Sequence, residues 1–367
     1  MRWQWLPLPS PDAVCIDGSR SGISYRSAAG GTNAGTKLAN KKRWVLYFQG
    51  GGWCHSTADC ALRGLSAMGS NSTALGSPHT VPQGHGIIDP CCTVSVDFCD
   101  YNKVFFHYCD GASFFGARQS SLRLEASPVR LSRLPPSQVY SAGRAIVASA
   151  IQLLVDSFGL GEATDVMVAG FSAGGLAALL NAEAIRTALR AAGAPLRRFK
   201  VASFAGVFLP SAAPSSPLEG QLQATFEGTQ ASDSCASWLR RRGLSVGRDA
   251  WRCAVDAAPL EVLPRSLPVF VAQSTVDWVR PLRVEPEPVA RTPWADAPAF
   301  WPVPVTHSSR WVATSVQASR PTSEPTAALE LGTVARRATS WYPCLQRARH
   351  RSCARCTASL RALPPRF

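Results

Sequence analysis

The sequence predicts an α/β fold, in which a mostly parallel sheet carries helices on both faces. Short runs of β-branched and aromatic residues alternate with longer runs whose apolar residues recur at helical spacing. Alternation of this kind places successive strands in parallel, with the connecting helices packed against the sheet. At 367 residues and 46% hydrophobic content, the chain can bury one large core of this type.

Seven elements follow from these patterns. Buried strands are expected where short apolar runs are bounded by turn residues, at 43–49, 103–108, 165–169, 200–204 and 267–275. One helix is expected at 141–158, where Ile146, Ala150 and Leu154 fall on one face. A second is expected at 173–192, an alanine- and leucine-rich run that ends in Gly-Ala-Pro.

The remaining stretches set the domain organisation. Residues 61–100 are rich in Gly, Ser, Pro and Cys, which indicates loops pinned by disulfides. After Pro281 the pattern fades, and no strand or helix is expected before about residue 326. We therefore expect a short segment at 1–14, one α/β domain at 15–280, and a divergent or partly disordered Pro/Arg-rich region at 281–367.

The charge is strongly positive but unevenly placed. The net charge is +14, from 38 basic and 24 acidic residues. Residues 281–367 alone hold 12 Arg and 5 acidic residues, a net +7. Because no zinc-finger or aromatic-basic RNA-binding pattern accompanies this charge, we expect no nucleic-acid partner. The longest apolar stretch, 145–155, is about half of the roughly 20 residues that a membrane span needs, so no span is expected.

Twelve cysteines favour disulfides and an oxidising compartment. The alternative is zinc, for which Cys344, His350, Cys353 and Cys356 have suitable spacing, but no second Cys-x-x-Cys frames them. We expect no metal. The first residues, MRWQWLPLPSPDAVC, lack the apolar run of a signal peptide, which favours a mature or truncated form or a mis-assigned start.

The strongest chemical signal is Gly170-Phe171-Ser172-Ala173-Gly174, between the expected strand at 165–169 and the helix at 173–192. A G-x-S-x-G turn in this context presents its serine as a nucleophile at the carboxyl end of the sheet. The alternative is a serine that only caps the helix, since Ser is favoured at that position.

A nucleophile of this type needs donors for the oxyanion that forms on the carbonyl oxygen. Gly50-Gly51-Gly52-Trp53 follows the strand at 43–49, where α/β-hydrolases carry a glycine-rich oxyanion loop. The backbone amides of Gly52, Trp53 and Ala173 are the expected donors. The alternative is a flexible turn, which would not explain the Trp-Cys pair that follows the glycines.

The acid and the base should follow Ser172 in the chain order of α/β-hydrolases. Asp277 comes directly after the last expected strand and is the best placed acid; Asp256 and Glu261 are less well placed. Only His307 and His350 follow Asp277, and His350 is our choice of base. The earlier histidines would break the order; these are His55, His79, His85 and His107.

Several segments together resemble the pectin acetylesterase family, which includes the Notum carboxylesterases. They run in order from Cys15 to Trp278: CIDGSRSGISYR, LYFQGGGWCHSTADCALR, GSPHT, HYCDGASFFG, GFSAGGLAALL, FAGVFL and VAQSTVDW. The resemblance implies a secreted or cell-wall serine esterase of the α/β-hydrolase type, without metal or organic cofactor, that removes acetyl groups from pectin. It places the nucleophile at Ser172, the acid at Asp277 and the oxyanion donors at Gly52, Trp53 and Ala173.

Two positions depart from the family pattern. Phe204 stands where the family usually has an aspartate. The family histidine lies in a Cys-x-x-His-Cys setting near the C-terminus, where this chain has Arg347, and His350 comes three residues later. Three functions are therefore weighed: a pectin acetylesterase, which is preferred; a Notum-like carboxylesterase on another acyl ester; and an inactive pectin-binding relative. The oligomeric state stays open.

Overall fold

The computed structural model describes residues 3–28, 42–72, 81, 86–89, 96–123, 138–208, 217–226, 231–255, 258–274 and 311–316. The strands in these ranges are β1 (Gln4–Pro7), β2 (Gly22–Arg26), β3 (Arg43–Phe48), β4 (Asn102–Phe106), β5 (Arg118–Arg123), β6 (Gln138–Ser141), β7 (Asp165–Phe171), β8 (Arg198–Phe204), β9 (Val269–Ser274) and β10 (Trp311–Val316). The α-helices are α1 (Thr57–Arg63), α2 (Gly143–Phe158), α3 (Ala173–Ala191), α4 (Pro217–Phe226), α5 (Asp233–Arg241) and α6 (Ala258–Val262). Single turns of 3-10 helix include η3 (Gly86–Ile88), η4 (Val96–Phe98), η5 (Leu160–Glu162) and η6 (Ala250–Ala254).

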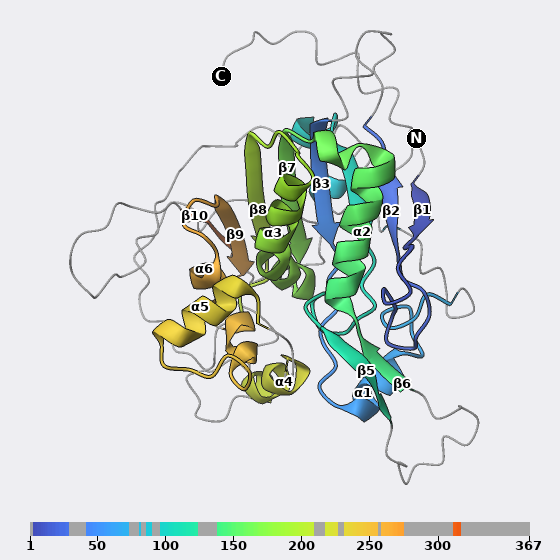
Figure 1. Ribbon diagram of the computed structural model, residues 1–367, viewed down its shortest axis with the longest axis vertical. Coiled ribbons are helices and arrows are strands. Elements are labelled where there is room, and N and C mark those ends of the chain that lie inside the picture. The colour runs from blue at the N-terminus through green and yellow to red at the C-terminus, as the bar shows by residue number, and fades with distance from the viewer. Residues whose placement is uncertain are drawn as a thin grey trace, which may run out of the picture.

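Eight of these strands form one sheet, in the order β1-β2-β4-β3-β7-β8-β9-β10 (Figure 1). The five inner strands from β4 to β9 pair in parallel. The edges are antiparallel, with β1 and β2 on one side and β10 on the other. The predicted mostly parallel sheet is therefore confirmed, and β5 and β6 form a separate two-stranded sheet.

All seven elements predicted from the sequence are present, with bounds that differ by a few residues. The antiparallel edge strands were missed, because QWLP and GISYR are short and mix polar with apolar residues. The prediction of no strand between Pro281 and about residue 326 was wrong, since β10 pairs along the full length of β9. The sheet thus extends into both the 1–14 and the 281–367 segments.

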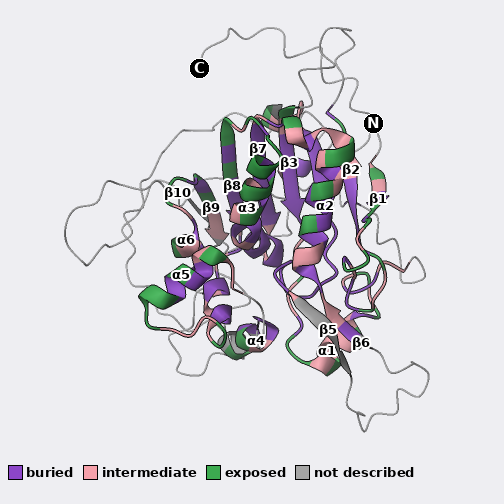
Figure 2. Ribbon diagram, in the orientation of Figure 1, coloured by how far each residue is buried: buried purple, intermediate pink, exposed green. Residues whose placement is uncertain are grey.

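Helices α2 and α3 lie side by side on one face of the sheet and bury their apolar sides against it (Figures 1 and 2). On the opposite face, Val45, Tyr47 and Phe105 form a second buried cluster that includes Ile88 of η3. Side chains from both faces are therefore removed from water, which explains why the inner strands are almost continuously apolar. Among the described helices, none combines the length and apolar character needed to cross a bilayer.

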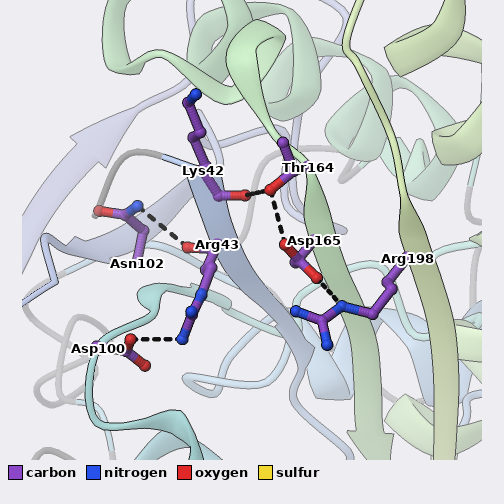
Figure 3. Close-up of polar contacts among 7 residues, drawn as sticks. All are labelled: Lys42, Arg43, Asp100, Asn102, Thr164, Asp165 and Arg198. Carbon is purple, nitrogen blue, oxygen red and sulfur yellow. Dashed lines mark hydrogen bonds and ion pairs between the residues drawn. The ribbon is translucent and has the colours of Figure 1, made fainter. Parts of the chain in front are cut away.

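Polar side chains join the amino ends of the inner strands (Figure 3). Arg43 donates to Asp100 at 2.6 Å, and Asn102 donates to the carbonyl oxygen of Arg43 at 3.1 Å. Asp165 accepts from Thr164 at 2.6 Å and pairs with Arg198 of the neighbouring strand. The hydroxyl of Thr164 also donates to the Lys42 carbonyl at 3.3 Å, so these contacts together join the amino ends of β4, β3, β7 and β8.

Three disulfides lie within the described residues: Cys15–Cys109, Cys54–Cys60 and Cys235–Cys253. They join residues that are 94, 6 and 18 positions apart in the chain, respectively. The disulfide-pinned loops expected from the cysteine count are confirmed at these positions. Two of the three fasten segments that follow β3 and β4 at the carboxyl edge.

The disulfides should differ in how much they stabilise the fold. In the chain-entropy account, a crosslink stabilises by about 4–5 kcal/mol for a loop the length of Cys15–Cys109, and by about 2 kcal/mol for the short Cys54–Cys60 loop. We expect Cys15→Ala with Cys109→Ala to lower the free energy of unfolding by roughly 2–3 kcal/mol more than Cys54→Ala with Cys60→Ala. Urea unfolding of the two double variants measures the difference, and equal losses would contradict the prediction.

Candidate active site

Ser172 occupies a sharp turn between β7 and α3, with φ 56° and ψ −127°. Its amide donates to the carbonyl oxygen of Phe204 in β8 at 2.8 Å, and its carbonyl accepts from Leu176 at 3.1 Å. Its side chain makes no capping hydrogen bond to α3. The helix-cap alternative is therefore not supported, because a capping serine uses its hydroxyl oxygen for the first amides of the helix.

The glycines around this turn are required by close backbone contacts. A Cβ at Gly170 would overlap the carbonyl of Gly174, and a Cβ at Gly174 would overlap the backbone of Phe48. A Cβ at Gly50 would overlap the carbonyl of Phe171 and come within 3.1 Å of the Ser172 Cβ. The glycine-rich segment after β3 therefore lies directly against the serine turn, as an oxyanion loop must.

The three expected oxyanion donors are available in this arrangement. Gly52 has φ +68°, so the loop turns in a conformation that favours glycine. Ala173 is the first residue of α3, where helix amides have no partner within the helix. Within the described part of the chain, the amides of Gly52, Trp53 and Ala173 donate no hydrogen bond. The predicted role as oxyanion donors requires N–H groups without an acceptor in the protein, and these three meet that requirement within the described residues.

Residues that the sequence interpretation did not single out hold this loop in place. The hydroxyl of Tyr108 donates to the Gly52 carbonyl at 2.7 Å, and Arg63 donates to the Gly51 carbonyl at 2.5 Å. The indole N–H of Trp53 donates to Ser113 Oγ at 2.8 Å. Tyr108 and Ser113 belong to the YCDGASF stretch. The polar residues within this otherwise apolar stretch are the sequence signal that could have indicated a role for them.

A compact apolar cluster lies next to the loop and to the first turn of α3. Trp53 makes an edge contact with Phe208, with ring centroids 4.6 Å apart. The cluster joins α4 and η6 to α3 and to the segments that follow β4 and β8. Its buried members are Ala112, Phe115, Leu176, Phe208, Leu222, Phe226, Trp251 and Ala254. Thr225 of α4 also donates to the Cys54 carbonyl at 3.1 Å. Helices α4 and η6 are thereby packed beside the candidate oxyanion loop.

The expected acid and base lie outside the described residues. This holds for Asp277 and His350, and for the alternatives His307 and Asp256. Glu261 is described and is bound elsewhere, since it accepts from Trp238 at 2.9 Å and from Arg242 at 2.5 Å. The two described histidines have partners other than Ser172.

Those two histidines are His55 and His107. His55 pairs with Asp59 at 3.2 Å, and the buried His107 lies 2.7 Å from the hydroxyl of Ser24. In the described ranges, no group of three or more His, Cys, Asp or Glu lies together as metal ligands would. The four residues of the zinc alternative, 344, 350, 353 and 356, fall outside those ranges.

Comparison with known proteins agrees with this arrangement. The family model described as Pectinacetylesterase matches residues 7–295, more than half of the chain. The chain belongs to the pectin acetylesterase family. The match includes β2, the serine turn and the loop after β3, so the motifs that carry the resemblance lie in the region that the family model covers.

Individual members of the pectin acetylesterase family are distant. Pectin acetylesterase 5 of Arabidopsis thaliana is 29% identical over 174 residues, 47% of this chain and 35% of that protein. The palmitoleoyl-protein carboxylesterase NOTUM of Mus musculus is 26% identical over 202 residues, 55% of this chain and 35% of that protein. The chain thus matches about a third of the length of these curated relatives.

The fold is also that of a solved relative. A crystal structure of the Wnt deacylase Notum from Drosophila superposes with a TM-score of 0.57 at 22% identity, covering 74% of this chain and 71% of that one. Together with the mostly parallel sheet and the serine turn, this confirms the α/β-hydrolase-like fold class predicted from the sequence.

Asp110 is a buried carboxyl beside the candidate site. One oxygen accepts from the Phe114 amide at 3.1 Å, and the other is buried near Gly143 at the start of α2. Burial raises the pKa of Asp110 from 3.8 to about 6, against the opposing effect of hydrogen bonds from Phe114 and Ala112. The native protein therefore binds the proton of this carboxyl more tightly than the unfolded chain does.

This shift predicts a pH-dependent difference in stability. Between pH 4 and 6 the unfolded chain releases the Asp110 proton first, so the contribution of Asp110 to stability falls as pH rises and levels off above about pH 6. Asp110→Asn removes this loss, which amounts to about 3 kcal/mol at most. Relative to wild type, the variant should gain stability as pH rises from 4 to 7 in urea unfolding. A difference that does not change with pH would contradict the shift.

The glycine contacts give a second prediction. Gly174→Ala places a methyl group against the backbone of Phe48 and Gln49. To relieve the overlap, either the end of β3 or the first turn of α3 would have to shift. We expect a loss of about 1–3 kcal/mol in stability and the loss of reaction at Ser172. The control is Gly220→Ala in α4, where a methyl group meets no atom within 4 Å and alanine favours the helix. Equal melting temperatures for the two variants would contradict the tight fit at the turn.

Proposed function

We propose that this protein is a serine esterase that hydrolyses acetyl esters of pectin in the cell wall. The observation that carries the proposal is the strained turn at Ser172, with its hydroxyl unused by the helix and the glycine loop of β3 packed against it. Membership of the pectin acetylesterase family supports the same chemistry. No metal or organic cofactor takes part in the proposed reaction.

The reaction proceeds through an acyl-enzyme. The Ser172 Oγ attacks the acetyl carbonyl carbon while its proton passes to the imidazole of His350, which Asp277 orients. The amides of Gly52, Trp53 and Ala173 stabilise the oxyanion. The bond to the sugar oxygen breaks, and that oxygen takes the proton from the imidazolium. Water then attacks the acetyl-serine, acetate leaves, and Ser172 regains its proton.

The packing next to the site favours a short acyl group. Leu176, one turn after Ser172, is fully buried and packs in one cluster with Phe115 and Phe226. The rings of Trp53 and Phe208 make an edge contact next to the same cluster. We expect these side chains to limit the room for a long acyl chain on Ser172, whereas an acetyl group needs little room. This supports acetyl esters over the lipid esters of the Notum branch.

The proposed location is extracellular, in the cell wall. Three disulfides within the described residues are typical of proteins that fold in an oxidising compartment. The partner is the acetylated polysaccharide itself. The basic character of the chain favours an acidic polymer, and that attraction should weaken as the salt concentration rises.

The direct test is acetate release from acetylated pectin by the full chain, beside Ser172→Ala, Asp277→Asn and His350→Ala. We expect each variant to lose at least about 100-fold in rate, because members of one triad act as a unit. His307→Ala, in the same region of the chain as His350, is the matched control and should keep wild-type activity. Acetate release unaffected by Ser172→Ala would contradict the mechanism.

Two further measurements distinguish the alternatives. A series of p-nitrophenyl esters from acetate to palmitate should show rates that fall with chain length; rates that rise would favour the Notum-like carboxylesterase. Binding of pectin without acetate release, and without labelling of Ser172 by a fluorophosphonate, would favour the inactive pectin-binding relative.

A further inference from the structure

The two loop amides expected to bind the oxyanion belong to peptide groups whose carbonyls are both held by side chains. In a trans peptide the carbonyl of one residue and the N–H of the next point in opposite directions. The Gly51 carbonyl therefore sets the direction of the Gly52 amide, and the Gly52 carbonyl sets that of the Trp53 amide. Because glycines resist peptide rotation least, a loop of this sequence needs outside contacts to keep both amides in one direction.

Tyr108 holds the second of these carbonyls. Its ring is fully buried behind the loop, and its hydroxyl donates to the Gly52 carbonyl at 2.7 Å while accepting from the Ser113 amide at 3.0 Å. Burial raises the pKa of Tyr108, which favours the protonated hydroxyl that donates to Gly52. The Tyr108 amide is itself fixed by Gln49 at 2.9 Å. These contacts hold the donor against the loop.

Arg63 holds the first carbonyl. It is the last residue of α1, and it donates to the Gly51 carbonyl at 2.5 Å and to the Met68 carbonyl at 3.1 Å. Its guanidinium also lies over the Tyr108 ring, 5.2 Å from the centroid. The Cys54–Cys60 disulfide joins α1 to the loop, which keeps Arg63 within reach of Gly51.

Ser113 completes the arrangement on the side of the indole ring. Its Oγ accepts from Trp53 Nε1 at 2.8 Å, and its amide donates to Tyr108. Ser113 has φ 50° and is fully buried, so the backbone turn determines where its hydroxyl lies. The same turn thus contacts both the Trp53 side chain and the residue that holds the Gly52 carbonyl.

We propose that Arg63 and Tyr108 are positioning residues that clamp the Gly51 and Gly52 carbonyls and so aim the Gly52 and Trp53 amides at the oxyanion, with Ser113 securing the Trp53 ring. This rests on the proposed esterase function and adds to it the side chains that determine the shape of the oxyanion loop. In this role none of the three needs to contact the substrate. They act only through the direction of the loop amides.

The test uses variants that remove a donor or acceptor and keep most of the packing: Tyr108→Phe, Arg63→Met and Ser113→Ala. With p-nitrophenyl acetate, Tyr108→Phe and Arg63→Met should each lower kcat by about 10- to 100-fold and leave KM within about threefold, because the amides act on the transition state. Ser113→Ala should lower kcat less. Arg63→Lys, which keeps the charge and one donor, should lose less than Arg63→Met.

Labelling of Ser172 by a fluorophosphonate gives a readout that does not require turnover. Its rate should fall in the same order, because the phosphonyl oxygen occupies the oxyanion position. Tyr47→Phe and Arg43→Met are the controls: the first is a fully buried tyrosine on the opposite face of the sheet, and the second is a partly exposed arginine at the amino edge. In both variants the fluorophosphonate should label Ser172 at the wild-type rate.

Trp53→Phe provides a double-variant test of the Ser113 contact. If Ser113 acts through the indole N–H, then Ser113→Ala should have little further effect on kcat in the Trp53→Phe background. Wild-type labelling and kcat in Tyr108→Phe and Arg63→Met, with only their melting temperatures lowered, would overturn the clamp and leave the esterase function standing. Absence of labelling in the wild type would overturn both.

Discussion

The pairing register of β3 with β7 is the constraint on which the candidate site depends. Phe48 lies opposite Gly170, so the residues two positions later, Gly50 and Ser172, meet beyond the ends of the two strands. A slip of one residue would turn every side chain of β3 to the other face and move the glycine loop away from the serine. At the amino edge, the Thr164 amide donates to the Lys42 carbonyl at 2.8 Å, which helps fix this register from the other end.

The parts that could be predicted from sequence are those determined by local pattern. The inner strands are buried on both faces, so their sequences are apolar runs. The serine turn is recognisable by its glycines, which are needed because a side chain there would overlap neighbouring backbone. The edge strands β1, β2 and β10 are short and mixed, and they are ordered by pairing with a neighbour. Arg63 could not be assigned from sequence, because its contact with Gly51 arises only after α1 folds back on the loop.

The proposed oxyanion donors fall into two groups that are fixed by different means. The Ala173 amide is held by α3, whose backbone hydrogen bonds and buried apolar face set its direction. The Gly52 and Trp53 amides belong to a loop with no regular structure, so their direction depends on the side chains of Tyr108 and Arg63. The direction of the two loop amides is therefore more easily disturbed than that of the Ala173 amide. Substitutions at Tyr108 or Arg63 can change it without altering Ser172.

Backbone strain in the described residues gathers at the carboxyl edge of the sheet. The non-glycine residues with positive φ are Ser113, Phe114, Ser172 and Ala205, and they follow β4, β7 and β8. Each such conformation costs about 1–3 kcal/mol and persists only where its surroundings determine it. The Cys15–Cys109 and Cys54–Cys60 crosslinks border the first of these turns and the oxyanion loop. Reduction should consequently loosen the candidate site before the sheet, since the inner strands are held by their own pairing and burial.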